Sequence, residues 1–312
     1  MKSRFWEERR VLITGASGML GRSVVELLSK LGAEEIIRPS HDECNLIETA
    51  SVKELLIKHK PRIVFHLAGK VGGIEANKRF PATFFRDNLA MGMNIIEASM
   101  LGDVEKLVMI GTTCSYGLSA EPPFRESDIF EGYPEPTNGA YGVSKRALLP
   151  MCQAYRDQFG FNSIYLVLAN LYGPVSHWDT ELSHAIPSMV KKFCDAVSSG
   201  KQDVILWGDG SAVREYIYVD DAAKAIVKAA ETYESKEPLN IGTGKWQHMK
   251  TIAQIISRET GFKGQITWDV SRPAGQLSRW LDVSRMQEEL VFSPKTKFVD
   301  GIRETIKSYL HG

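Results

Sequence analysis

Two short motifs in this sequence could together carry out hydride transfer. Gly15, Gly18 and Gly21 follow a short apolar run, and glycines so spaced after a strand let the pyrophosphate of a dinucleotide approach the backbone. The N-terminal amides of the following helix then face that charge. Tyr141 and Lys145 lie four residues apart and share one helix face. An ammonium group lowers the pKa of a neighbouring tyrosine, so this pair can exchange a proton with a carbonyl oxygen.

The elements that must position these motifs alternate through the first half of the chain. Strands are expected at residues 11–14, 34–37, 63–67, 107–110 and 163–168, and helices at 18–31, 51–59, 81–100 and 138–159. Apolar strands that alternate with helices are typical of a parallel sheet covered by helices on both faces. The carboxyl ends of such strands line one crevice, where ligands bind.

We therefore expect an α/β protein with a Rossmann-like, doubly wound parallel sheet. The dinucleotide-binding domain is assigned to residues 1–172 with about 213–238. A smaller mixed α+β C-terminal substrate domain takes residues 173–212 and 239–312. A chain of 312 residues has room for one large core and a smaller one.

Composition narrows the class of partner. Lys and Arg together number 38, as do Asp and Glu, so no overall charge attracts nucleic acid or a membrane surface. The four cysteines form no CxxC pair and have no metal-ligand spacing, which favours a reducing compartment and predicts no metal site. Without a signal-peptide core or a long apolar stretch, we expect a cytoplasmic protein.

The end of the second strand predicts the type of dinucleotide. An acidic residue there binds the ribose hydroxyls of NAD, whereas a cation accommodates the 2′-phosphate of NADP. Arg38 occupies this position, and the first acid is Asp42. We therefore expect NADP(H), with an ordinary solvated arginine as the alternative reading of Arg38. The rest of the expected cofactor site comprises Gly15, Ser17, Gly18, Met19, Leu20, Gly21, Asn45, Leu46, Leu67, Ala68, Gly69, Lys145, Asn170 and Leu171.

Hydroxyl groups follow the fourth expected strand, in residues 111–117. They lie in the same crevice as Tyr141 and can orient a substrate carbonyl. Thr112 is the residue expected to do so.

At this point the sequence resembles the extended short-chain dehydrogenase/reductases and, within them, the GDP-L-fucose synthase family. The resemblance runs from about Val11 to the C-terminus. The more restricted matches are Lys70-Val71-Gly72-Gly73, Cys114 and Ser183-His184, while Ala76-Asn77, Asn170-Leu171-Tyr172-Gly173-Pro174 and Arg214-Glu215 extend them. The resemblance implies C3 and C5 epimerisation of GDP-4-keto-6-deoxymannose followed by NADPH-dependent reduction at C4, in a homodimer formed through helices beside the sheet.

The resemblance also implies roles for individual residues. Cys114 would remove protons beside the keto group and His184 would return them, while Lys192, Arg214 and Arg279 would bind the pyrophosphate or sugar and Trp207 the guanine. Four of these residues have a structural alternative. Cys114 could be a small buried residue and His184 could pack against a helix start. Lys192 could be solvated, and Arg214 could form a buried ion pair with Glu215.

Three positions depart from the family pattern. Thr112 replaces a serine and keeps the hydroxyl, Ser17 replaces an arginine and weakens the NADP prediction, and Ala274 replaces an acid, which bears on the sugar. Relatives that reduce other GDP-4-keto sugars, such as deoxyheptoses, share much of the motif set. The main hypothesis is therefore a C4 reductase with prior epimerisation. A C4 reductase without epimerase activity and, more distantly, a non-catalytic NADP-binding sensor or scaffold are its rivals.

Overall fold

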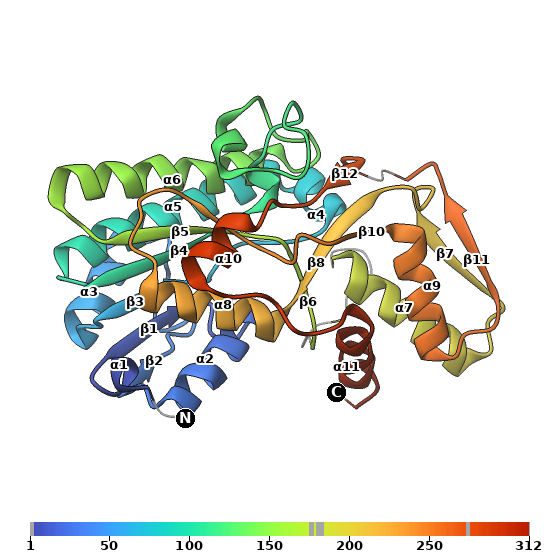
Figure 1. The fold of residues 1–312 in the computed structure, drawn as a ribbon, viewed down its shortest axis with the longest axis horizontal. Helices are drawn as coiled ribbons and strands as arrows, with labels where there is room; N and C mark the ends of the chain where they lie inside the picture. Colours follow the sequence, from blue (N-terminus) through green and yellow to red (C-terminus); the bar gives the residue numbers. More distant parts are fainter. Residues whose placement is uncertain (1–2, 175–177, 179–183, 273–274, 312) are drawn as a thin grey trace.

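The computed structural model describes residues 3–174, 178, 184–272 and 275–311. A six-stranded parallel sheet with the order β2-β1-β3-β4-β5-β9 forms its larger part (Figure 1). Its strands are β1 (Arg10–Thr14), β2 (Glu35–Ile37), β3 (Ile63–His66), β4 (Lys106–Thr112), β5 (Ser163–Leu168) and β9 (Leu239–Ile241). The predicted parallel sheet is confirmed, and the five expected strands end within two residues of the observed ones.

Helices cover both faces of this sheet, because its central strands are buried on both sides. One layer contains α3 (Thr49–His59), α5 (Pro81–Leu101) and α6 (Gly139–Phe159). The other contains α2 (Met19–Leu31), α8 (Val219–Thr232) and α10 (Ser284–Leu290), with the short α1 (Arg4–Glu7) beside α2.

The strand order reverses between β1 and β3, so a crevice opens at their carboxyl ends. Side chains fix the two strands to each other at this point. Thr14 Oγ1 lies 2.9 Å from His66 Nδ1 and accepts a hydrogen bond from the Ala68 amide at 3.3 Å. The glycine-rich loop after β1 and the loop after β3 are therefore held in register.

The smaller part has its own core and confirms the predicted mixed α+β architecture. Strand β8 (Val213–Tyr218) pairs with β6 (Asn170–Tyr172), β10 (Trp246–His248) and β12 (Ser278–Arg279). A separate pair joins β7 (Asp203–Trp207) to β11 (Gln265–Asp269). The helices of this part are α7 (Ala185–Ser199), α9 (Met249–Thr260) and α11 (Phe298–His311). Elsewhere, α4 (Ile74–Arg79) contacts α5. Two short helices, η1 (Thr113–Ser115) and η2 (Glu126–Phe130), follow β4.

The course of the chain between the two parts differs from the expected division. Strand β9 pairs with β5 in the large sheet, and Leu281, Met286 and Leu290 pack in the large core, although the expected division places residues 239–312 in the smaller part. Conversely, β8 belongs to the smaller sheet, although the expected division places residues 213–238 in the larger domain. A fully buried three-residue strand such as β9 is too short to show a periodicity in the sequence.

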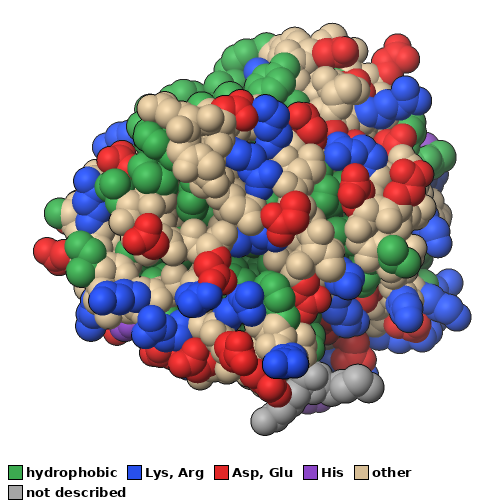
Figure 2. Space-filling model, turned by 60° about the vertical axis from the view of Figure 1, so that its left-hand side comes forward, with side chains coloured by type: hydrophobic (Ala, Val, Ile, Leu, Met, Phe, Trp, Pro, Cys, Tyr) green, Lys and Arg blue, Asp and Glu red, His purple; other side chains and the backbone are tan. Residues whose placement is uncertain are grey.

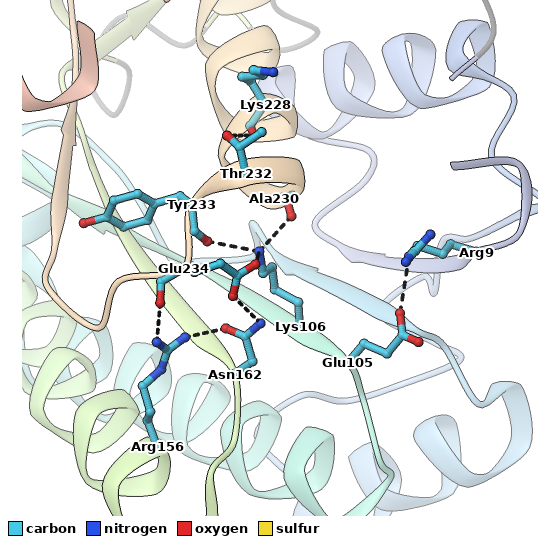
Figure 3. Close-up of polar contacts among 10 residues, drawn as sticks. All are labelled: Arg9, Glu105, Lys106, Arg156, Asn162, Lys228, Ala230, Thr232, Tyr233 and Glu234. Carbon is cyan, nitrogen blue, oxygen red and sulfur yellow. Dashed lines mark hydrogen bonds and ion pairs between the residues drawn. The ribbon is translucent and has the colours of Figure 1, made fainter. Parts of the chain in front are cut away.

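A polar network holds the amino end of β4 against the C-terminus of α8 (Figure 3). The side chain of Lys106 is 6% exposed, and its ammonium donates to the carbonyl oxygens of Ala230 and Tyr233, both at 3.0 Å, and to Glu234. Arg156 in turn donates to the Glu234 carbonyl oxygen. These cations satisfy carbonyl groups that the end of a helix leaves without partners.

Acidic and basic side chains are interspersed over the face that Figure 2 shows, in line with the equal numbers of the two charges. No helix among the described residues is long and apolar enough to cross a membrane. The described residues also contain no group of three or more His, Cys, Asp or Glu that could hold a metal ion.

Candidate active site

One cavity of about 1080 Å³ extends along the carboxyl edge of the large sheet and into the smaller part. It brings together every predicted site residue except Arg38. The residues predicted to bind the cofactor that line it are Gly15, Ser17, Gly18, Met19, Leu20, Gly21, Asn45, Leu46, Leu67, Ala68, Gly69, Lys145, Asn170 and Leu171. The other predicted residues that line it are Thr112, Cys114, Tyr141, His184, Lys192, Trp207, Arg214 and Arg279.

The glycine-rich loop has the shape that a pyrophosphate requires. Gly15 has φ +72°, and a Cβ atom there would lie 2.7 Å from the Ala68 backbone nitrogen, so a side chain would be both strained and obstructed. Helix α2 begins at Met19, and its first amide groups face the cavity without a side-chain cap. A dinucleotide phosphate fits these free donors.

Thr112, at the carboxyl end of β4, and Tyr141 both line the cavity. Burial raises the pKa of Tyr141, the nearby Cys114 raises it further, and the Thr112 side chain opposes both. This direction is opposite to the lowering expected from Lys145. The phenol is therefore a neutral proton donor, as reduction of a ketone requires.

Lys145 lies one turn after Tyr141 and is buried. Burial lowers the pKa of its ammonium to about 8, an effect that the Cys152 thiol opposes. Burial also lowers the pKa of His66 to about 3, with a further contribution from Lys145, so this imidazole is neutral at physiological pH. At physiological pH the Lys145 ammonium is therefore charged, whereas the His66 imidazole is not.

Cys114 and Tyr141 are held together by close backbone packing. A Cβ atom on Gly142 would lie 2.1 Å from the Cys114 carbonyl oxygen, so only glycine lets α6 approach this loop. The Cys114 amide donates to Thr112 Oγ1 at 3.2 Å. From the smaller part, Arg279 Nη1 lies 3.1 Å from Cys114 Sγ. A guanidinium of the smaller part is therefore a direct neighbour of the sulfur that the resemblance makes the base.

Three further residues line the far end of the cavity. His184 precedes α7 and is exposed to the cavity, although surrounding protein lowers its pKa by desolvation. Lys192 Nζ lies 5.8 Å from the Trp207 ring centroid and donates to the Ile205 carbonyl oxygen at 2.9 Å. Lys192 is therefore not simply a solvated lysine.

Arg214 and Glu215 do not form the ion pair considered as an alternative, because neighbouring strand residues point to opposite faces. Arg214 lines the cavity and donates to the Val213 carbonyl oxygen at 2.8 Å; burial and the nearby Arg279 lower its pKa to about 10. The Glu215 carboxylate instead accepts bonds from the amides of Leu281 at 2.7 Å and Gly244 at 2.8 Å.

Arg38 is exposed and does not line the cavity. The cavity wall nearest to it contains Ser40, His41 and Asn45. Ser183 and Ala274, which carried part of the family comparison, lie outside the described residues.

Several residues at or beside the site have no role predicted from the sequence, although Asn77 belongs to the family match Ala76-Asn77. Asn77 lines the cavity, Arg272 has its guanidinium carbon 5.3 Å from the Trp207 ring centroid, and Gln276 accepts a bond from Arg279 Nε at 3.2 Å. His66 could have been noticed, since it is a polar residue at the end of an otherwise apolar strand. The positions of Arg272 and Gln276 gave no such signal, because they lie in irregular segments.

The fold and the cavity define an enzyme of the dinucleotide-dependent α/β class. Residues 11–242 match the NAD dependent epimerase/dehydratase family. A probable GDP-L-fucose synthase from Oryza sativa subsp. japonica is 36% identical over 302 residues, which cover 96% of this chain and 92% of the relative.

Solved structures agree with this assignment. A GDP-6-OMe-4-keto-L-xylo-heptose reductase from C. jejuni superposes with a TM-score of 0.92 at 28% identity, covering 96% of this chain and 97% of the other. A GDP-mannoheptose C4 reductase from Campylobacter jejuni with NADP bound gives a TM-score of 0.87 at 29% identity, covering 96% and 98%. The chain belongs to the GDP-L-fucose synthase family, within the NAD dependent epimerase/dehydratase family.

Proposed function

We propose that this protein reduces the C4 ketone of a GDP-4-keto-6-deoxy sugar with NADPH, after epimerising the sugar at C3 and C5. The observation that carries the proposal is the convergence of Thr112, Cys114 and Tyr141 with Arg279 in one cavity. The names of the relatives support a GDP-linked sugar as the substrate.

In the reduction, the residues act on the ketone oxygen. When bound, NADPH supplies the hydride that adds to C4. Tyr141 gives its phenolic proton to the oxygen as the carbonyl electron pair moves onto it, and the Thr112 hydroxyl polarises the carbonyl beforehand. Lys145 keeps its charge below about pH 8, so it can bind the nicotinamide ribose and support reprotonation of Tyr141.

In the epimerisation, protons leave and return at carbons beside the ketone. A carbonyl acidifies such protons, so one enolising site can serve both C3 and C5. Cys114 takes the proton, with the Arg279 guanidinium beside its sulfur, and His184 returns one to the other face. Arg214 and Lys192 bind the pyrophosphate, and Trp207 lies against the guanine.

The cofactor proposal is NADP(H) rather than NAD(H). Solved relatives contain NADP, and the described cavity wall formed by Pro39, Ser40, His41 and residues 44–47 has no acidic side chain to repel a 2′-phosphate. Arg38 can reach this phosphate only by turning from solvent toward the cavity. Equal use of NADH and NADPH would refute the assignment.

We also propose a homodimer through the outer surfaces of α5 and α6, in the reducing environment of the cytoplasm. Apolar side chains are exposed on these helices at Phe85, Met93, Leu101 and Phe159. All four cysteines are free thiols. Light scattering of the purified chain measures the mass, and a monomer at micromolar concentration would refute the dimer.

The second candidate is a C4 reductase without epimerase activity, which the likeness to heptose C4 reductases favours. The test follows NADPH oxidation with GDP-4-keto-6-deoxymannose in deuterated water, with NMR of the product. Deuterium at C3 and C5 would establish both activities, whereas reduction without exchange would establish the reductase alone. NADPH that stays unoxidised with this ketone and with the deoxyheptose ketone would refute both.

A further inference from the structure

Asn77, on α4, carries a buried hydrogen-bond acceptor that no described residue satisfies. The residue is 7% exposed and lines the large cavity. Its amide nitrogen donates to the carbonyl oxygens of Gly72 at 2.9 Å and Gly73 at 3.0 Å. Because both partners can only accept, the nitrogen must face them and Oδ1 must face away.

A second unsatisfied amide oxygen, Oδ1 of Asn138, belongs to the same region. Asn77 and Asn138 both line the large cavity and a side hollow of about 250 Å³, which Thr137 and Ala140 also line. Buried amide oxygens need hydrogen-bond donors, and leaving one unpaired costs free energy. The boundary between the cavity and the side hollow therefore suits a ligand that brings hydroxyl groups.

The boundary also adjoins the proton donor of the reaction. Asn138 precedes α6, and Ala140 directly precedes Tyr141. A sugar whose ketone oxygen bonds Tyr141 lies in the cavity that both asparagines line, so groups on the two ring carbons beside the ketone can approach this boundary. On a GDP-4-keto-6-deoxyhexose these are C3, which carries a hydroxyl, and C5, which carries a methyl group. Only the C3 hydroxyl can donate to an amide oxygen.

We propose that Asn77 is a specificity-determining residue whose Oδ1 accepts a hydrogen bond from the hydroxyl beside the keto carbon. The inference rests on the proposed function, because it requires the ketone at Tyr141. It narrows the substrate class to GDP-4-keto sugars with a free C3 hydroxyl and disfavours their 3-deoxy counterparts. With a 3-deoxy sugar the Asn77 oxygen stays buried and unpaired, which weakens binding of the transition state.

The experiment compares kcat/KM for NADPH oxidation with GDP-4-keto-6-deoxymannose and with its 3-deoxy analogue. The unaltered protein is expected to prefer the hydroxylated ketone about tenfold or more. Asn77→Ala removes the acceptor, so its preference should approach the ratio of the intrinsic reactivities of the two ketones. The matched control is Asn94→Ala. Asn94 also donates to two backbone carbonyl oxygens, those of Leu46 and Ile47, but its own oxygen is paired with Thr49 and it does not line the cavity.

The outcomes are separated by dividing the preference of the unaltered protein by that of each variant. The intrinsic reactivities of the two ketones cancel in this ratio. A preference that falls in Asn77→Ala and persists in Asn94→Ala supports the inference. An equal rate with both ketones in the unaltered protein, or an unchanged preference in Asn77→Ala, overturns it even if the variant is less stable. Consumption of neither ketone overturns the proposed function instead.

Discussion

The buried imidazole of His66 predicts a specific loss of stability in mild acid. The residue is 1% exposed and its pKa is lowered to about 3, mainly by burial, whereas an unfolded histidine titrates near ~6.5. Between these values the unfolded chain binds one more proton than the folded chain, so stability falls as the pH falls through this window. At pH 5 the cost is RT ln(1 + 10^1.5), or about 2 kcal/mol. This figure barely changes for any folded pKa below about 4.

The assay is urea unfolding at pH 7.5 and pH 5 without NADPH, since a bound cofactor would shift apparent stability. His66→Gln keeps a neutral side chain that can bond Thr14, and it should lose about 2 kcal/mol less than the unaltered protein between the two pH values. The control His311→Gln replaces an exposed histidine on α11 and should behave as the unaltered protein does. If His66→Gln loses as much stability as the unaltered protein, His66 is not the buried neutral group described.

Three other predictions concern separate parts of the chain. Arg279→Met should change the rate at which iodoacetamide alkylates Cys114 at pH 7, because the sulfur loses the guanidinium that lies 3.1 Å from it. An unchanged rate, followed by peptide mass spectrometry, would contradict the contact. Tyr141→Phe should reduce turnover about 10²–10⁴-fold but leave deuterium exchange beside the ketone, so loss of both together would argue against separate roles. Lys106→Met should lower the free energy of unfolding, measured by urea denaturation, by about 2–4 kcal/mol, because the end of α8 and Glu234 lose their cation. A decrease no larger than the experimental error would show that the network does not stabilise the fold.

The sequence was sufficient to predict the parts of the site whose residues follow strands directly. Gly15, Thr112 and Asn170 each come at or just after the end of a buried strand, and parallel strands bring such ends to one edge. Local spacing also placed Tyr141 and Lys145 on one helix. The direction of the Tyr141 pKa shift could not be predicted, because burial depends on packing that spacing does not specify.

The sequence was not sufficient where a contact joins segments that are far apart in the chain. Arg279 lies in a two-residue strand of the smaller part, yet its guanidinium reaches Cys114 in the loop after β4. No periodicity predicts such a contact, since it depends on how the two parts dock. Arg38 is the reverse case: its residue type and position suit a 2′-phosphate, but its side chain is exposed and does not line the cavity.

Glu215 shows how the docking of the two parts is built. In the sequence it stands beside Arg214 and suggests an ion pair, but the alternation of a strand turns the two side chains to opposite faces. Its buried carboxylate binds the amide of Leu281, which packs in the large core two residues after Arg279. One carboxylate therefore connects the strand that carries Arg214 to the segment that carries Arg279 and to the large core. The cationic end of the site is thus positioned by an acid on the opposite side of the strand, a role that only the three-dimensional arrangement reveals.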